Sequence, residues 1–140
     1  MILADSGFWI ALGSRSDRYH DRAVRAAQKY AAEGFITTWP VLTEVVHLLA
    51  HRVHPDRANV FVGDIAHGAA IVADLPDDAL LRIETLMRRY ANLPMDLADA
   101  SLVVLAEELG EGRILSSDAR DFEGYRWKNR KPFVNLLLAD

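Results

Sequence analysis

The residues of this sequence best suited to chemistry are acids that stand in apolar surroundings. Asp5 and Asp99 have almost only apolar neighbours, Glu44 is the only charged residue in the stretch 35–46, and Asp118 closely follows an apolar segment. A carboxylate in such surroundings is costly unless it is paired or bound to a cation. These four acids are therefore the first candidates for a functional site.

Three of these acids also have structural interpretations that need no ligand. Asp5 can cap the turn formed by residues 6–12, because an Asp side chain accepts hydrogen bonds from free N–H groups at a helix start. Glu44 can complement the positive end of its helix, and Asp118 can belong to an ordinary turn. Taken alone, Glu44 fits the structural interpretation better, whereas Asp5 leaves both open.

Asp96 and Asp99 lie three residues apart at the start of an apolar helical pattern. This spacing places both carboxylates on one helix face. Asp96 fits the position of an N-cap, whereas Asp99 is better explained by a functional role. Asp121, three residues after Asp118, is more ambiguous than Asp118.

Four unpaired carboxylates close together repel one another, which raises the pKa of some of them. Hard divalent cations relieve this repulsion, and Mg²⁺ or Mn²⁺ prefers oxygen ligands. A second metal site is conceivable, because Glu44, His47 and His51 lie on one helical stripe and could bind zinc. Such residues more often simply face a polar edge.

The elements that position these acids follow from the hydrophobic pattern. Strands are predicted at 1–4, 35–37, 70–72 and 113–115, with a possible fifth at 133–136, and helices at 17–32, 41–52, 55–66, 77–90 and 96–109. This alternation predicts a three-layer α/β/α sandwich around a mostly parallel sheet of about five strands. Function in such sheets gathers at the carboxyl ends of strands, where Asp5 and Asp118 are expected.

The bulk composition restricts the class of protein. The 140 residues predict one domain spanning 1–140, with 51% hydrophobic and 26% charged residues typical of a globular chain. The absence of cysteine excludes disulfides and thiolate metal sites. A net charge of −4 argues against a protein that simply coats nucleic acid. Neither a membrane span nor a signal peptide is indicated, so we expect a cytoplasmic protein.

The sequence resembles PIN domains of the VapC toxin type. Four segments carry the resemblance, in order and over essentially the whole chain: Ile2-Leu3-Ala4-Asp5-Ser6, Thr43-Glu44-Val45, Leu97-Ala98-Asp99-Ala100-Ser101-Leu102, and Leu115-Ser116-Ser117-Asp118-Ala119-Arg120-Asp121-Phe122. The resemblance implies a five-stranded parallel α/β/α sandwich that binds Mg²⁺ or Mn²⁺ and cleaves RNA. It also implies the toxin half of a toxin–antitoxin pair, with a small antitoxin as partner and a homodimer as the common assembly.

The resemblance assigns the catalytic roles to Asp5, Glu44, Asp99 and Asp118. Metal binding falls to Asp5, Asp99 and Asp118, with Asp96 as an extra acid beyond the core four. Ser116 stands where the family has a hydroxyl that supports the last acid. Ser6 and Asp121 are further supporting candidates.

The implied reaction is hydrolysis of an RNA phosphodiester, in which bound metal activates water and the carboxylates position the metal. Candidate phosphate contacts are Arg120, Arg126, Lys128 and Arg130. The last three flank Trp127, and this mixture of positive charge and an aromatic ring suits single-stranded RNA. A solvated loop explains the same segment equally well.

Three other functions fit less well. A phospho-accepting receiver would need adjacent acids at the first strand end, but Asp5 lies between Ala4 and Ser6. A phosphatase of the Asp-x-Asp kind would need a second acid where Gly7 stands. The main alternative is a catalytically inactive PIN fold that binds RNA or protein, and the presence of all four acids speaks against it.

Overall fold

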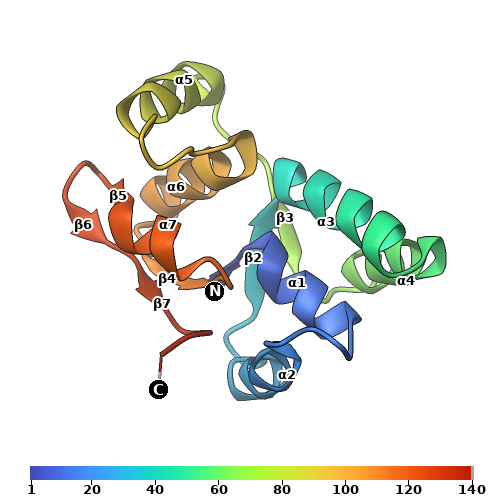
Figure 1. The fold of residues 1–140 in the computed structure, drawn as a ribbon. Helices are drawn as coiled ribbons and strands as arrows, with labels where there is room; N and C mark the ends of the chain where they lie inside the picture. Colours follow the sequence, from blue (N-terminus) through green and yellow to red (C-terminus); the bar gives the residue numbers. More distant parts are fainter. Residues whose placement is uncertain (140) are drawn as a thin grey trace.

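Five parallel strands form the central sheet of the computed structural model, which describes residues 1–139 (Figure 1). The order across the sheet is β3-β2-β1-β4-β7. Its strands are β1 (Ile2–Ala4), β2 (Phe35–Thr38), β3 (Ile71–Ala73), β4 (Arg113–Leu115) and β7 (Val134–Asn135). The parallel sheet predicted from the sequence is confirmed.

Seven helices lie within the described residues, and they cover the sheet. They are α1 (Ser6–Gly13), α2 (His20–Lys29), α3 (Trp39–Arg52), α4 (Pro55–Ala66), α5 (Ala79–Arg89), α6 (Leu97–Leu109) and α7 (Ala119–Gly124). All residues of β1 are buried, although successive side chains of a strand point to opposite faces. Helices must therefore cover both faces of the sheet, as a parallel sheet requires.

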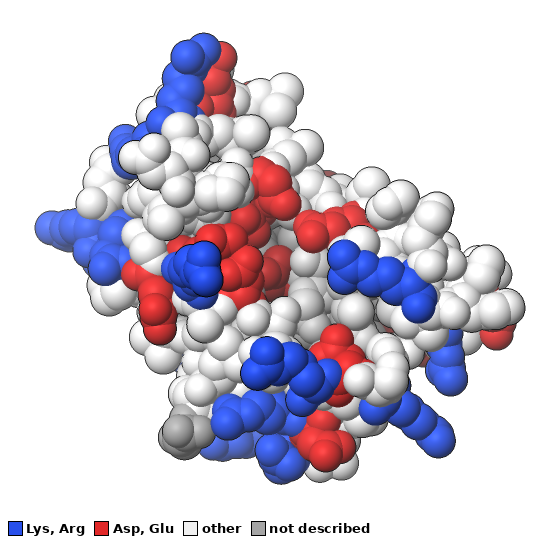
Figure 2. All heavy atoms as spheres, viewed as in Figure 1, with Lys and Arg blue, Asp and Glu red and all other residues white. Residues whose placement is uncertain are grey.

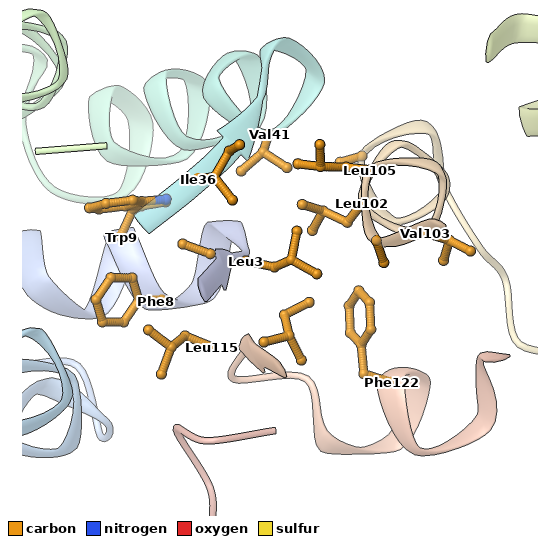
Figure 3. Packing of buried hydrophobic residues seen from close by; sticks show 14 of the residues in the cluster. Leu3, Phe8, Trp9, Ile36, Val41, Leu102, Val103, Leu105, Leu115 and Phe122 are labelled. Carbon is orange, nitrogen blue, oxygen red and sulfur yellow. The ribbon is translucent and has the colours of Figure 1, made fainter. Parts of the chain in front are cut away.

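The core forms where the helices meet the central strands. Figure 3 shows Leu3 of β1 in the middle of apolar side chains from α1, α3, α6 and α7. Eight residues of α6 are buried, which agrees with its nearly continuous apolar sequence. No helix within residues 1–139 has the length and apolar character that a membrane span needs.

Strand β1 sets the register of the sheet at its carboxyl edge. Leu3 pairs with Ile36 of β2, and Ala4 pairs with Leu115 of β4. Asp5 therefore lies beside Ser116, the residue that follows β4. A further link crosses from β2 to α6, where the buried hydroxyls of Thr38 and Ser101 are 2.7 Å apart.

Several helices predicted from the sequence extend beyond the ends of the observed helices. The helix predicted at 17–32 begins only at His20, because the Asp17 carboxylate accepts a hydrogen bond from the Tyr19 backbone N–H at 2.8 Å and forms a turn. Helix α3 instead begins earlier than predicted, at Trp39, with Pro40 in its first turn. The predicted third strand is displaced by one residue.

The segment after β4 contains structure that the sequence analysis did not predict. Helix α7 follows Asp118, and the chain then forms an antiparallel hairpin from β5 (Arg126–Trp127) and β6 (Lys131–Pro132). Lys128 and Asn129 have positive φ in the turn between the two strands. A tight hairpin turn commonly requires such backbone conformations.

Gly7 allows helix α1 to approach the loop that follows β4. A Cβ atom at this position would lie 1.9 Å from Ser117 Oγ and 2.8 Å from Ser117 Cβ. We expect Gly7→Ala to lower the free energy of unfolding by roughly 1–3 kcal/mol, because the loop must move. Gly63→Ala in α4 is the matched control, since a Cβ there meets no atom within 4 Å, and it should stabilise by about 0.5–1 kcal/mol. Urea unfolding measures both, and equal effects would contradict the packing argument.

Candidate active site

The acidic residues predicted from the sequence meet at the carboxyl edge of the sheet. Asp5 follows β1 directly, and Asp118 begins helix α7 after β4. Figure 2 shows acidic side chains gathered in the middle of one face, around a hollow between α6 and α7 on one side and α1 and α3 on the other. Lysine and arginine side chains lie mainly around this area.

Asp5 is the most deeply buried of these acids, with 4% of its surface exposed. Its Oδ1 accepts a hydrogen bond from the Ser6 backbone N–H at 2.7 Å, and its Oδ2 accepts one from the Ser116 hydroxyl at 2.8 Å. Burial raises the pKa of Asp5, and the hydrogen bonds from Ser116 and Ser6 oppose this effect. Asp5 is therefore a helix cap that also belongs to the acidic cluster.

Ser116 connects Asp5 with the loop that carries Asp118. Besides donating to Asp5, its hydroxyl oxygen accepts a hydrogen bond from the Asp118 backbone N–H at 3.0 Å. The Asn135 side chain of β7 binds the Ser116 backbone on both sides, accepting from its N–H at 3.2 Å and donating to its carbonyl at 2.9 Å. The outermost strand thus holds the end of β4 in place.

Helix α6 contributes two acids with different environments. Asp96 is exposed and caps the helix, accepting a hydrogen bond from the Asp99 backbone N–H at 2.8 Å. Asp99 points further inward, and the Tyr125 hydroxyl donates to its Oδ2 at 3.1 Å. Burial, followed by the charges of Asp5 and Asp96, raises the pKa of Asp99 to about 8.

Glu44 and Asp121 complete the cluster from opposite sides. Burial and then the charges of Asp96 and Asp5 raise the pKa of Glu44, which lies on α3. Burial and the neighbouring Asp118 carboxylate raise the pKa of Asp121, on α7, to about 6. Each acid therefore experiences the negative charge of residues from other elements.

Tyr125 and Asn135 are parts of the site that the sequence analysis missed. Tyr125 is buried directly after α7, and its hydroxyl also lies 3.2 Å from the Leu93 carbonyl. Its contact with Asp99 joins positions 26 residues apart, and the contact of Asn135 with Ser116 spans 19. A single sequence gives no signal for either pairing.

The donor chemistry of the cluster fits a hard divalent cation. The side-chain donor atoms of the cluster are carboxylate and hydroxyl oxygens, the type that Mg²⁺ and Mn²⁺ prefer. Asp96 uses only Oδ1 in the hydrogen bonds of the described residues, which leaves its Oδ2 for a ligand. The carboxylates do not yet converge, however, because no three His, Asp or Glu side chains of residues 1–139 form a ready metal site. A cation would have to draw them together.

The same observation gives no support to a zinc site on α3. Glu44, His47 and His51 are not arranged as a metal site in the described part of the chain. His51 Nδ1 instead lies 2.8 Å from the His47 carbonyl oxygen, and the two imidazole rings pack with their centres 4.2 Å apart.

The basic candidates lie in two places. Arg120 is exposed in the first turn of α7, and its positive charge attracts the Asp121 carboxylate. Arg126 donates to the carbonyls of Glu123 and Tyr125, while Lys128 and Arg130 are exposed in the β5–β6 turn. Of the four basic candidates, Arg120 is therefore the one most directly associated with the acids.

Trp127, the aromatic residue among the basic candidates of this segment, is buried in the hairpin. Only 7% of it is exposed, and its indole N–H donates to the Pro132 carbonyl at 3.1 Å. The hairpin turns the ring inward, so Trp127 offers little surface on which an RNA base could stack.

Comparison with known proteins agrees with this geometry. A family model described as the PIN domain matches residues 2–128, a range that contains all four core acids. The chain belongs to the PIN-domain family. Among solved structures, this PIN domain is similar to Mycobacterium tuberculosis VapC20, described as a toxin that cleaves the sarcin-ricin loop. The TM-score is 0.75 at 20% sequence identity, over 86% of this chain and 92% of VapC20. No curated protein sequence matches this PIN domain.

The raised pKa of Asp99 predicts how stability changes with pH in EDTA. With a pKa of about 8 in the folded protein and an ordinary value of 3.8, Asp99 holds its proton more tightly when folded. The contribution of Asp99 to the free energy of unfolding is therefore fully present below pH 4 and is lost as the pH rises toward 8. Between pH 5 and pH 8, we expect the free energy of unfolding of wild type to fall by roughly 3 kcal/mol more than that of Asp99→Asn.

Urea unfolding at several pH values measures this difference. Asp64→Asn is the matched control, because Asp64 is exposed on α4 away from the cluster, and it should follow wild type. Parallel pH curves for wild type and Asp99→Asn would contradict the electrostatic account of the site.

Proposed function

We propose that this PIN-domain protein is a metal-dependent endoribonuclease that hydrolyses RNA phosphodiester bonds. The observation that carries the proposal is the gathering of acids from separate elements at one edge of the sheet. Burial first, and then the charges of Asp5 and Asp96, raise the pKa of Asp99 to about 8. Such mutual repulsion opposes folding and is typical of functional sites. A divalent cation bound by this cluster would neutralise the repulsion and could bind a phosphate of the RNA.

The residues proposed to hold Mg²⁺ or Mn²⁺ are Asp5, Asp99 and Asp118, with Asp96 at the rim of the cluster. When bound, such an ion stabilises the charge on a phosphate and lowers the pKa of water. Glu44, the fourth core acid, faces this group from α3 and shares its electrostatic environment.

The remaining residues of the proposed site position the acids and the substrate. Ser6 and Ser116 fix both oxygens of Asp5, and Tyr125 orients Asp99 through its hydroxyl. The exposed guanidinium of Arg120 offers a forked donor for a phosphate of the RNA. The chain itself supplies no nucleophile in this proposal.

We further propose that this nuclease is the toxin of a cytoplasmic VapBC-type pair, with a small antitoxin and a second copy of the chain as partners. The fold likeness to VapC20 supports this role. An apolar groove of about 810 Å³ between α3 and α4, which includes Leu42, Val46 and Ile65, offers a surface for a protein partner.

Replacing one acid tests the proposed reaction. Wild type should cleave RNA with Mn²⁺ or Mg²⁺ and not with EDTA, and Asp99→Asn should reduce the rate on the order of a hundredfold or more, because even residues behind metal ligands cost 10–100-fold. A panel of structured and unstructured RNAs is the substrate, and circular dichroism confirms folding. Asp64→Asn is the control and should keep wild-type activity.

Full activity of Asp99→Asn would overturn the site assignment. RNA binding without any metal-dependent cleavage by wild type would instead favour the inactive binding module.

A further inference from the structure

We propose that Trp39 is a stacking platform for an unpaired RNA base beside the acidic site. This inference rests on the proposed nuclease function and adds a substrate preference to it. Trp39 begins helix α3 at the end of β2, and 62% of its surface is exposed. The other two tryptophans are buried, with Trp9 at 6% and Trp127 at 7% exposure.

Trp39 shares one open groove of about 690 Å³ with two acids at the edge of the cluster. Glu44 and Asp96 line this groove together with Trp39 and the half-exposed Leu97. The groove therefore leads from an apolar aromatic wall to Glu44 and to Asp96, at the rim of the proposed metal site. A nucleotide fits this layout if its base stacks on the ring while its phosphate meets the cation that the acids are proposed to hold.

The backbone at Trp39 is fixed, whereas its side chain is exposed and lines both this groove and the apolar groove between α3 and α4. Its carbonyl oxygen accepts a hydrogen bond from the Thr43 hydroxyl at 3.2 Å, and Pro40 restricts the backbone that follows it. No hydrogen bond or ring contact of the described residues involves the Trp39 indole. A rigid aromatic side chain with a free face binds a flat ligand at low entropic cost.

The proposed ligand is an unpaired base rather than a duplex. Bases in an A-form helix are already stacked on their neighbours, whereas bases in loops and single strands can stack on protein aromatic rings. Such stacking tolerates any base identity, because every base has a π-face. The site should therefore prefer RNA segments with a free base next to the phosphate that is cut.

Binding measurements with a cleavage-deficient protein test this platform without relying on catalysis. The background is Asp118→Asn, and the probes are a labelled single-stranded adenine-rich RNA and a duplex of equal length, followed by fluorescence anisotropy. Adding Trp39→Ala should weaken binding of the single strand on the order of ten- to a hundredfold, with little effect on the duplex. Trp39→Phe should restore most of the affinity, and Leu80→Ala, 75% exposed on α5, should have no effect.

Cleavage kinetics separate the platform from the nuclease proposal. In the otherwise wild-type enzyme, Trp39→Ala should raise KM with kcat nearly unchanged, since Trp39 contacts a base and not the reacting atoms. An unchanged KM and unchanged single-strand affinity would overturn the platform while leaving the nuclease proposal intact. A change only in self-association, measured by sedimentation, would also overturn it, because Trp39 would then belong to a protein interface. Absence of all cleavage by wild type would instead overturn the nuclease, and the anisotropy result would still decide the platform.

Discussion

Helix capping by aspartate is the interaction on which the site depends. Asp5, Asp96 and Asp118 each accept a backbone N–H at the start of α1, α6 or α7. Capping of this kind contributes about 1 kcal/mol per residue, and the positive end of a helix also favours a carboxylate. The helix starts therefore hold negative charges close together although those charges repel one another.

The rest of the fold brings the starts of these helices together at the carboxyl edge of the sheet. The pairing of Ala4 with Leu115 places Asp5 beside Ser116, and the Asn135 side chain fixes the Ser116 backbone from the neighbouring strand. On the opposite side of β1, the buried contact between Thr38 and Ser101 ties β2 to the helix that carries Asp99. The apolar core beneath the site makes this arrangement rigid, and the carboxylates remain the part that is electrostatically unsatisfied.

The sequence predicted the strands and the acids for the same reason: both depend on local patterns. A short apolar run followed by an acid marks the end of a buried strand, so Asp5 could be placed without knowing its neighbours. Of the two interpretations that the sequence left open for Asp5, the structure confirms the cap, and the functional role stays a prediction. One oxygen caps the helix and the other faces Ser116 in the cluster.

The missed features depend on contacts between distant positions. Helix α7 has only six residues, too few to show a helical period, and Phe122 holds it in the core. The turn at 128–130 folds the chain back on itself and buries Trp127. Trp39, at the start of α3, stays exposed. Sequence composition could not distinguish these two tryptophans, because the difference lies in which one the fold covers.

The most direct test of the central claim is the effect of Mn²⁺ on the stability of wild type and Asp118→Asn. Asn can still cap α7, so in EDTA the variant should be at least as stable as wild type, because one repelling charge is gone. Mn²⁺ at a hundredfold excess over Kd should stabilise wild type by about 2.7 kcal/mol and the variant much less. If Mn²⁺ stabilises neither protein and Asp118→Asn is simply less stable, Asp118 is a structural cap and the acidic cluster is not a cation site.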